Sequence, residues 1–424
     1  MRWEKDHGLP IHRINREAKK SKVIALKPEL DRWLLRGRPE NGASESSTAR
    51  RSPGLLAGLI AAVLTLAGGA GLLISILLRD SPPAGYKVEG RILSIIDGGG
   101  RTKWTIEIPA SGDQSSIYDE ADVVDGTAKL DRPKVAFLDA DGNGKQETAL
   151  FWNDDIPEKR GIALYDHKGV RLWLRELRYD IEYARTRWGG DFVPVQIQAA
   201  DIDGDGRPEI LALWRDNREC PSVFQVFSSD GEELGHYDHT GTFQVFTVFH
   251  RADGAADILL GGTNNLLGGD AVLVGLDGRD LPKGLGPPYA VPDDLRDRAA
   301  DLERFVPRQA PPARQKFYVR IRHNEISRGL GTQWMWLVRI SPAPDHISAL
   351  LFMGRDAFLT CDFGADLALR DLRPGADFIR AFDGWRARGI VHGSQRAFLD
   401  RCRRGVSYWD GRTWTSQPTV FPQP

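Results

Sequence analysis

Cysteine, methionine and net charge are all scarce in this sequence. It has 3 cysteines and 3 methionines among 424 residues, and 57 Lys and Arg balance 58 Asp and Glu. The three cysteines, Cys220, Cys361 and Cys402, are too few and too scattered for a disulfide framework or a cysteine-based metal site. The balanced charge gives no global electrostatic basis for binding nucleic acid.

The local motifs of common enzyme classes are also missing. The chain has no Gly-x-Ser-x-Gly, no P-loop, no dinucleotide fingerprint and no His-Glu-x-x-His. Its close histidine pair, His236 and His239, is expected on the surface without a third metal ligand nearby. We therefore predict that the protein is not an enzyme, and a quinoprotein-like or hydrolytic activity is only the third alternative.

Tight turns, in contrast, should be abundant. The sequence has 45 glycines and 25 prolines, which favour turns over long helices. A hydrophobic fraction of 41% with 27% charged residues excludes a disordered chain and a protein with many membrane spans. We therefore expect a mostly β body.

One long uncharged run, residues 54–78, predicts a single transmembrane helix. Its 25 residues would form a helix roughly 37 Å long, enough to cross a hydrocarbon core of about 30 Å. A cleaved signal peptide is the competing interpretation, but the run is too long and 53 residues precede it.

The charges around this run predict its orientation. Residues 1–53 carry 13 Lys and Arg against 7 Asp and Glu, whereas few positive charges follow the run. Because positive charge stays on the cytoplasmic side, we expect a bacterial inner (plasma) membrane protein with a cytoplasmic N-terminus and an extracytoplasmic C-terminal domain.

Small residues recur within the span at a spacing of four. They are Gly54 and Gly58, and then Ala67, Gly71 and Ser75. Such a face lets two helices approach closely, so the span would allow a homodimer. The alternative is the ordinary glycine and alanine content of membrane helices.

Residues 1–38 are expected to form a small α/β tail, followed by a polar linker at residues 39–53. Two short strands, at residues 11–14 and 22–26, flank a basic turn. A helix should follow over residues 28–35, because Pro28 stands in its first turn and acidic residues come early.

This tail resembles the second half of excisionase-like (MerR-type) winged helix-turn-helix domains. The matching segments are Arg2-Trp3-Glu4-Lys5, Gly8-Leu9-Pro10-Ile11-His12-Arg13 and Glu29-Leu30-Asp31-Arg32-Trp33-Leu34. The resemblance implies a recognition helix in the major groove and a wing on the phosphate backbone. The residues that would contact DNA are Arg2, Lys5, His12, Arg13, Arg16, Lys19, Lys20 and Lys22.

The first helix and most of the recognition helix of such a domain would lie upstream of Met1. The tail is therefore either a remnant or part of a longer domain. A basic tail that faces anionic lipid is the alternative interpretation.

Two segments beyond the span match each other closely. Residues 135–152 read VAFLDADGNGKQETALFW, and residues 197–214 read IQAADIDGDGRPEILALW. Oxygen atoms at alternate positions of a glycine-rich loop can converge on one hard cation, and the carbonyl at position 7 can complete the shell. The predicted calcium ligands are Asp139, Asp141, Asn143, Lys145 and Glu147 in one loop and Asp201, Asp203, Asp205, Arg207 and Glu209 in the other.

An EF-hand fails two tests at these loops. Position 12 would have to be Glu but is Leu150 or Ala212, and the flanking runs are typical of strands, not helices. The pattern instead resembles FG-GAP (VCBS, integrin-α-like) β-propeller repeats, and the resemblance implies calcium-binding inter-strand loops. That family usually has Asp at position 9, where this chain has Glu147 and Glu209. A solvated acidic turn that binds nothing is the alternative.

A third copy of the loop is degenerate. Aligning Asp257 with Glu209 places Phe249 and Arg251 where Asp201 and Asp203 stand, so we expect no metal there. Between the loops, a hairpin with a glycine turn recurs around Gly100, Gly169, Gly231 and Gly278. Trp104 and Trp173 beside these turns are expected to be core residues between blades.

Residues 86–290 therefore predict three to four propeller blades, and residues 291–424 a β-rich continuation with helices near 375–404. The expected function is a membrane-anchored, calcium-stabilised β-propeller that binds a protein or carbohydrate outside the cytoplasm. The alternative is a one-component transmembrane transcriptional regulator with a DNA-binding cytoplasmic tail.

Overall fold

The computed structural model divides the chain into two compact units, residues 1–79 and 80–424. The structure describes residues 81–108, 132–152, 160–177, 192–216, 221–286 without 282, 315–322, and 335–419 without 354–356, together with three short strand pairs. In the first unit it describes β1 (His12–Arg13) and β2 (Val23–Ile24), which pair antiparallel. These two strands fall within the two strand ranges expected in the tail, residues 11–14 and 22–26.

The predicted span at residues 54–78 and the linker at residues 39–53 lie outside the described residues. In the part of the chain that the structure describes, no helix combines the length and apolar character needed to cross a membrane.

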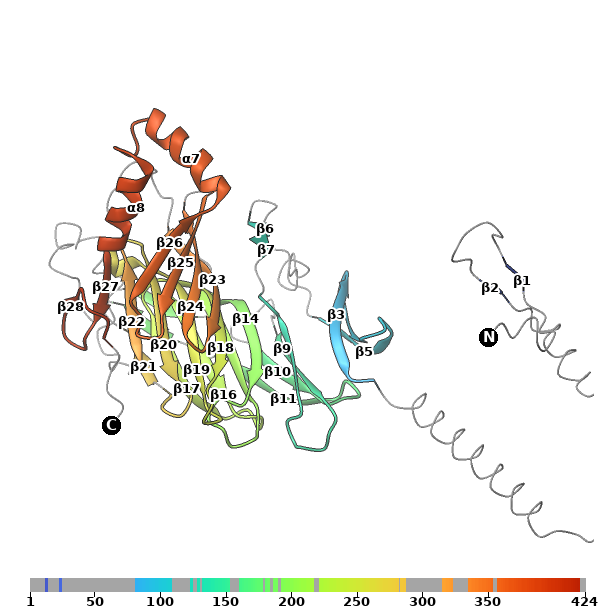
Figure 1. Cartoon of the computed structure of the whole chain (residues 1–424). Helices are drawn as coiled ribbons and strands as arrows, with labels where there is room; N and C mark the ends of the chain where they lie inside the picture. The colour runs from blue at the N-terminus through green and yellow to red at the C-terminus, as the bar shows by residue number, and fades with distance from the viewer. Residues whose placement is uncertain are drawn as a thin grey trace, which may run out of the picture. The chain divides into compact units, whose positions relative to one another are not determined.

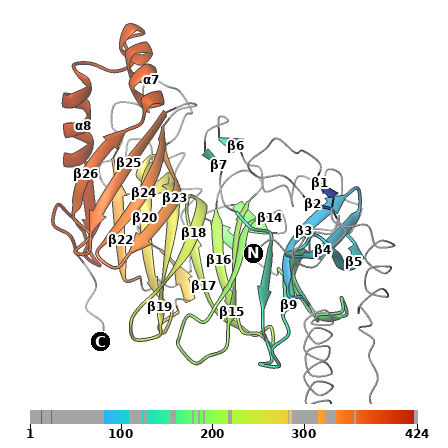
Figure 2. The same cartoon turned by 45° about the vertical axis from the view of Figure 1, so that its right-hand side comes forward.

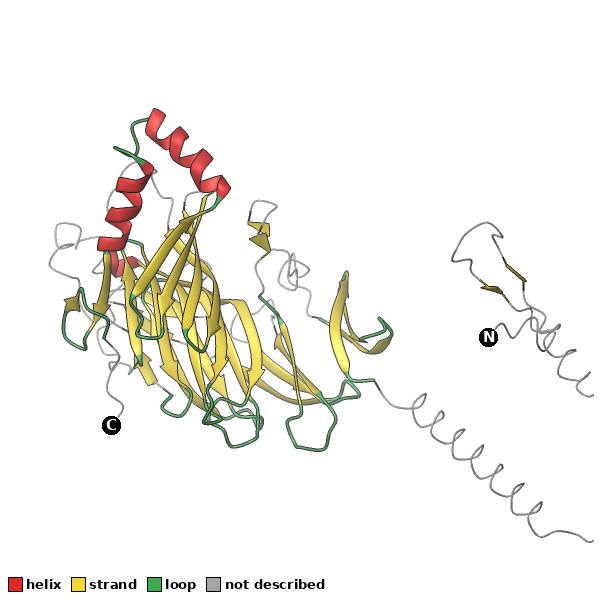
Figure 3. Ribbon diagram, viewed as in Figure 1, coloured by secondary structure: helices red, strands yellow, loops and turns green. Residues whose placement is uncertain are grey.

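The second unit is mostly β, as predicted, and its strands pair almost entirely antiparallel (Figures 1 and 3). The first sheet contains β3 (Pro83–Glu89), β4 (Ile92–Asp97) and β5 (Thr102–Glu107). The second sheet contains β8 (Val135–Leu138), β9 (Glu147–Trp152), β10 (Gly161–Tyr165) and β11 (Arg171–Glu176).

The third and fourth sheets are the widest. The third contains β14 (Phe192–Ala200), β15 (Glu209–Asp216), β16 (Ser222–Phe227), β17 (Glu233–His239) and, parallel to β17, β21 (Lys283–Leu285). The fourth contains β18 (Thr242–His250), β19 (Ala256–Asn264), β20 (Asp270–Asp277), β22 (Phe317–Ile321), β27 (Val406–Trp409) and β28 (Trp414–Thr415). The fourth sheet therefore joins strands from both of the ranges expected as propeller repeats and continuation.

The fifth sheet contains β23 (Met335–Ala343), β24 (His346–Met353), β25 (Ala357–Gly364) and β26 (Leu369–Pro374). The remaining described elements are two strand pairs, β6 (Val123–Val124) with β7 (Ala128–Lys129) and β12 (Asp180–Tyr183) with β13 (Thr186–Gly189), and the helices η2 (Asn265–Leu267), α7 (Ala376–Ala387) and α8 (Gln395–Arg404). Helices α7 and α8 fall within the stretch expected to be helical.

The five sheets lie side by side in chain order, and each neighbouring pair shares an apolar layer (Figure 2). Leu93 and Trp104 of the first sheet meet Leu150 of the second, and Phe151 of the second meets Trp214 of the third at a ring distance of 4.6 Å. Phe224 of the third sheet lies 5.2 Å from Phe246 of the fourth. Burial between sheets is thus the main source of stability in this unit.

This stacking explains the two kinds of strand in the sequence. Strand β15 lies between two sheets, so its run EILALW is buried on both faces. Strand β4, in contrast, alternates buried Leu93 and Ile95 with more exposed residues, because the described residues cover only one face of the first sheet. Helix α7 buries Phe378, Phe382 and Trp385 from a single face against the core shared with the fifth sheet.

A tryptophan and a glycine turn lock successive sheets together. Trp104 of the first sheet lies against the turn of the second sheet at Gly169, where a Cβ would come within 2.9 Å of the indole ring. Trp173 of the second sheet lies in the same way against Gly231 of the third, and its Nε1 donates to the carbonyl of Ser229 at 2.9 Å. Both tryptophans are therefore packing residues between sheets.

Replacing Gly169 by Ala should destabilise the second unit by about 2–4 kcal/mol. The turn has a positive φ of 84°, which costs an L-residue about 1–2 kcal/mol, and the added methyl group would also meet Trp104. The measurement is urea unfolding of residues 80–424.

Gly100→Ala is the matched control, because Gly100 has a φ of 77° in the corresponding turn but has no atom near its absent Cβ. It should lose only the backbone share, about 1–2 kcal/mol. Equal losses in the two variants would show that the tryptophan contact is not tight.

Candidate functional site

The first acidic loop, residues 139–146, joins β8 to β9, and its side chains accept hydrogen bonds from its own backbone. Asp139 Oδ2 accepts a hydrogen bond from the Gly144 amide at 2.9 Å, and Asp141 Oδ1 accepts from the Asn143 amide at 3.1 Å. Asn143 Oδ1 accepts from the Lys145 amide at 2.8 Å. Glycines at positive φ make this path possible, with Gly142 at 74° and Gly144 at 80°.

The second acidic loop, residues 201–208, joins β14 to β15 and repeats the same bonds. Asp201 Oδ2 accepts from the Gly206 amide at 2.9 Å, Asp203 Oδ1 from the Asp205 amide at 3.0 Å, and Asp205 Oδ1 from the Arg207 amide at 2.7 Å. The sequence match between the loops is therefore a match of geometry.

Each loop is closed by a glutamate at the start of the following strand. Glu147 Oε2 accepts from the Ala140 amide at 2.9 Å, and Glu209 Oε2 accepts from the Ile202 amide at 3.0 Å. Both glutamates are buried. Position 9 therefore has a structural role in both loops, which the sequence pattern leaves open.

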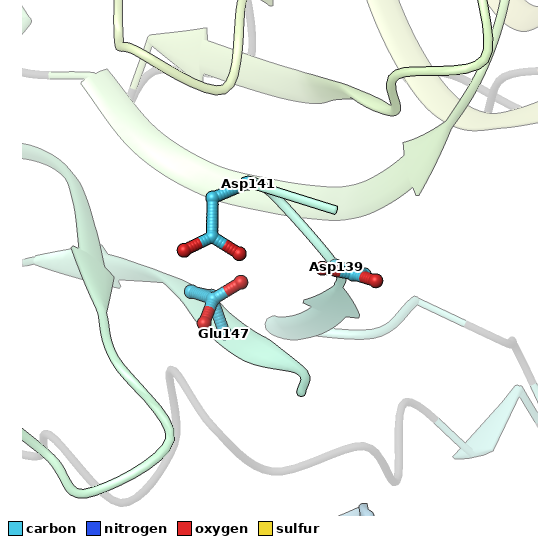
Figure 4. Close-up of side chains that lie close together, drawn as sticks. All are labelled: Asp139, Asp141 and Glu147. Carbon is cyan, nitrogen blue, oxygen red and sulfur yellow. The ribbon is translucent and has the colours of Figure 1, made fainter. Parts of the chain in front are cut away.

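Three carboxylates converge in each loop. One oxygen from each of Asp139, Asp141 and Glu147 lies within 4.8 Å of the others, and Asp201, Asp203 and Glu209 form the same arrangement. Figure 4 shows the carboxylates of Asp141 and Glu147 facing each other, with Asp139 beside them. Hard divalent cations take carboxylate ligands of this kind, so both triads could hold a metal ion.

The electrostatics of the triads fit such an ion. Burial, and then the charges of Asp203, Asp205 and Asp201, raise the pKa of Glu209 to about 7 from an ordinary 4.5. Burial and the charges of Asp141 and Asp139 raise the pKa of Glu147 in the same direction.

One oxygen of the first triad also lacks a partner. Asp139 Oδ1 is buried and has no hydrogen-bond partner among the described residues. A cation would satisfy this atom and relieve the repulsion between the carboxylates.

The rest of the predicted ligand shell is less sharply defined. Asn143 accepts a hydrogen bond from the Lys145 amide, and Asp205 accepts one from the Arg207 amide. Neither side chain is part of a triad. Their role as ligands, and that of the carbonyls of Lys145 and Arg207, stays a prediction.

The third loop, between β18 and β19, carries its own cation. The Arg251 guanidinium contacts Asp257 at 2.8 Å, Asp277 at 2.9 Å and Asp253 at 3.3 Å. Lys316 Nζ lies 2.6 Å from the second oxygen of Asp257. These carboxylates are therefore neutralised by side chains of the protein.

The strand register places Asp257 at the position of the two glutamates. Asp257 pairs with Phe249, as Glu209 pairs with Ala200 and Glu147 with Leu138. The third connection is one residue shorter, so Phe249 does not correspond to Asp201 as the ungapped alignment has it. Asp277 and Lys316 reach the cluster from β20 and from the residue before β22, which the local pattern could not reveal.

The second and third loops are joined directly. Arg279 donates from Nε to the carbonyl of Asp203 at 3.1 Å and from Nη1 to Asp253 Oδ2 at 2.9 Å. A Cβ on Gly204 would lie 3.2 Å from the backbone of Gly254. The shape of the second loop is therefore coupled to the fourth sheet.

Other residues singled out in the sequence have different outcomes. His239 is fully buried and lies 3.1 Å from the hydroxyl of Tyr318, so its expected surface position is wrong. Burial lowers its pKa to about 3. Of the residues expected to contact DNA, His12 and Arg13 lie on β1, and Arg2, Lys5, Arg16, Lys19, Lys20 and Lys22 lie outside the described residues.

Comparisons with known proteins give distant similarities. No protein-family model and no curated protein matches the sequence. A protein of unknown function from Bacteroides caccae is 10% identical over 70% of this chain and 93% of its own, with a TM-score of 0.26. The Dos1 propeller is 9% identical over 68% of this chain and 64% of its own, with a TM-score of 0.30.

A thermostable family-43 glycoside hydrolase is 12% identical over 57% of this chain and 71% of its own, with a TM-score of 0.28. TM-scores of this size do not establish a shared fold or a shared function with any of these proteins. The interpretation of the sheets and loops therefore depends on the contacts within this chain.

Glu209→Gln should stabilise the second unit at pH 8 in the presence of a chelator. The raised folded pKa means that Glu209 contributes stability below about pH 4.5 and loses it as the pH rises through about 7. A neutral glutamine avoids this loss, which is at most about 3 kcal/mol. Thermal unfolding at pH 5 and pH 8 measures the difference.

Glu232→Gln, in an exposed turn of the same sheet, is the control and should change neither value. A Glu209→Gln protein that is less stable than the parent at pH 8 without metal would contradict the repulsion.

Proposed function

We propose that this chain is a membrane-anchored, calcium-stabilised β-propeller that binds a protein or carbohydrate ligand outside the cytoplasm. The observation that carries the proposal is the pair of matching loops on consecutive sheets, each with three carboxylate oxygens within 4.8 Å of one another. Such carboxylate clusters suit calcium, which accepts variable oxygen coordination, better than magnesium, which demands a stricter octahedral shell.

A radial arrangement of the sheets is supported by a contact that skips one sheet. Arg132, just before the second sheet, donates from Nη2 to Gln244 Oε1 of the fourth sheet at 2.6 Å, and both residues are buried. Flat sheets stacked about 10 Å apart would separate these residues by roughly 20 Å, too far for one side chain. The first strands of the second, third and fourth sheets (β8, β14 and β18), here called the inner strands, therefore converge, as the blades of a propeller do.

Neighbouring inner strands are also bridged by side chains. The amide of Gln196 on β14 donates to the carbonyl of Phe246 at 2.8 Å and accepts from its N–H at 3.0 Å. Lys134 Nζ donates to the carbonyls of Pro194 and Val195. Such bridges fix the spacing of the inner strands from the second sheet to the fourth.

The sequence supports the anchor and the location. The uncharged run at residues 54–78 and the excess of Lys and Arg before it are typical of a single-pass protein whose C-terminal part lies outside a bacterial inner membrane. The clustered carboxylates are engaged in loop structure, which favours a binding protein over an enzyme.

Calcium should raise the thermal midpoint of residues 80–424. At a calcium concentration about 100 times the dissociation constant, each occupied site adds about 2.7 kcal/mol, or roughly 4 °C in a unit of this size. Asp203→Asn should remove about half of the total rise, because it weakens one of two triads. Differential scanning calorimetry with calcium and with chelator measures both effects.

Asp230→Asn is the matched control, since Asp230 is exposed in a turn of the same sheet and lies outside the triads. It should keep the full rise. Equal midpoints of the parent protein in calcium and in chelator would rule out metal-stabilised loops.

A further inference from the structure

A cavity of about 560 Å³ lies between α8, the end of β22 and the β27–β28 hairpin. This volume is within the range of about 300–1,000 Å³ that small-molecule sites occupy. The antiparallel pairing places it far from the acidic loops along the strands, because Ile321 pairs with Ala271 and Val406, whereas Lys316 approaches Asp257 at the loop end.

The cavity is lined by positive charge. Arg322, Arg401 and Arg404 contribute to its wall, and none of the described residues that line it is acidic. Arg322 and Arg404 form no ion pair within the described part of the chain. Arg403, the neighbour of Arg404, does not line the cavity and is neutralised by Asp371 at 2.8 Å.

Helix geometry explains only some of this charge. Arg401 and Arg404 stand in the last turn of α8, where cations are favoured by the helix dipole. Arg322 does not belong to the helix, and its amide donates to the carbonyl of Gly405 at 3.2 Å, which fixes it beside the helix end. The helix dipole of α8 therefore does not explain why the positive charge of Arg322 lies at the cavity.

Two buried polar atoms of the cavity lack a partner. Arg322 Nε and Ser407 Oγ are buried without a hydrogen-bond partner among the described residues. Leaving such a group unsatisfied costs about 1–3 kcal/mol. Both can donate, so the atom that would satisfy them is an acceptor, and a carboxylate only accepts.

One wall of the cavity is aromatic and held in place. Trp414 lies 5.3 Å from the ring of Trp409 and 5.7 Å from that of Tyr318. Arg320 covers its ring at 5.6 Å and is itself paired with buried Asp270 at 2.5 Å. A wall fixed in this way loses little entropy when a ligand binds.

We propose that this cavity binds a small ring-bearing carboxylate. The planar guanidinium groups of Arg322 and Arg404 match the two oxygens of a carboxylate, Ser407 adds a third donor, and Trp414 covers the ring. The site goes beyond the proposed calcium-stabilised binding module and does not depend on it, because no residue of the acidic loops lines the cavity.

Isothermal titration calorimetry of residues 80–424, a compact unit with its own cores, tests the site with benzoate, D-glucuronate and inorganic phosphate. Benzamide and glucose serve as the uncharged counterparts. At least one carboxylate should bind with a dissociation constant of about 1 mM or tighter, and its uncharged counterpart should not bind. Arg322→Gln and Arg404→Gln should each weaken binding about tenfold.

Arg396→Gln, on the same helix but outside the cavity, should bind as the parent does. Arg404 is exposed, so its variant keeps the test valid if Arg322→Gln fails to fold. The proposal is overturned if neither carboxylate binds, if phosphate alone binds, or if Arg396→Gln weakens binding as much as Arg404→Gln. The calcium response of the same samples is a separate readout, so either proposal can fail alone.

Discussion

The constraint on which the loop end of this protein depends is the repulsion between carboxylates that the backbone forces together. In both acidic loops the aspartates bend the chain by accepting its amide protons, and the same bends bring a buried glutamate into their field. The loop therefore cannot relieve its charge without losing its shape. Either the glutamate takes up a proton, as the raised pKa of Glu209 indicates, or a cation enters.

In the third loop, positively charged side chains of the protein itself offset the repulsion between carboxylates. Its acidic residue has the same strand register as the glutamates, but Arg251 and Lys316 supply the positive charge. The three loops thus form a series, with two that would depend on a cation from solution and one that does not. Arg279 joins the second loop to the third, so a metal in the second loop would strengthen a junction between sheets as well as a turn.

The sequence predicts the loops well because the side-chain bonds that shape each turn join residues two to seven positions apart. A repeated pattern of Asp, Gly and Glu within nine residues determines both the turn and the meeting of the acids. The same is true of the mostly β fold, which follows from glycine turns and apolar runs. What the sequence hides is non-local: the burial of His239 against Tyr318, the contact from Arg132 to Gln244, and the ion pairs of Asp277 with Arg251 and of Lys316 with Asp257. These contacts join residues 26 to 112 positions apart, and no periodicity in the chain encodes them.

The two ends of the strands differ in the polar side chains that they present. The loop end concentrates carboxylates whose oxygens accept hydrogen bonds within turns, which suits a structural ion. The other end holds arginines, a hydroxyl and a fixed indole around a cavity, and two of these donor atoms, Arg322 Nε and Ser407 Oγ, are buried without a hydrogen-bond partner among the described residues. Because the strands between them are buried on both faces and closely packed, the loop end can act as a rigid base for the cavity. Calcium in the proposed sites would then add to the stability that the apolar layers between the sheets supply, and the proposed arginine cavity would hold a ligand at the opposite end.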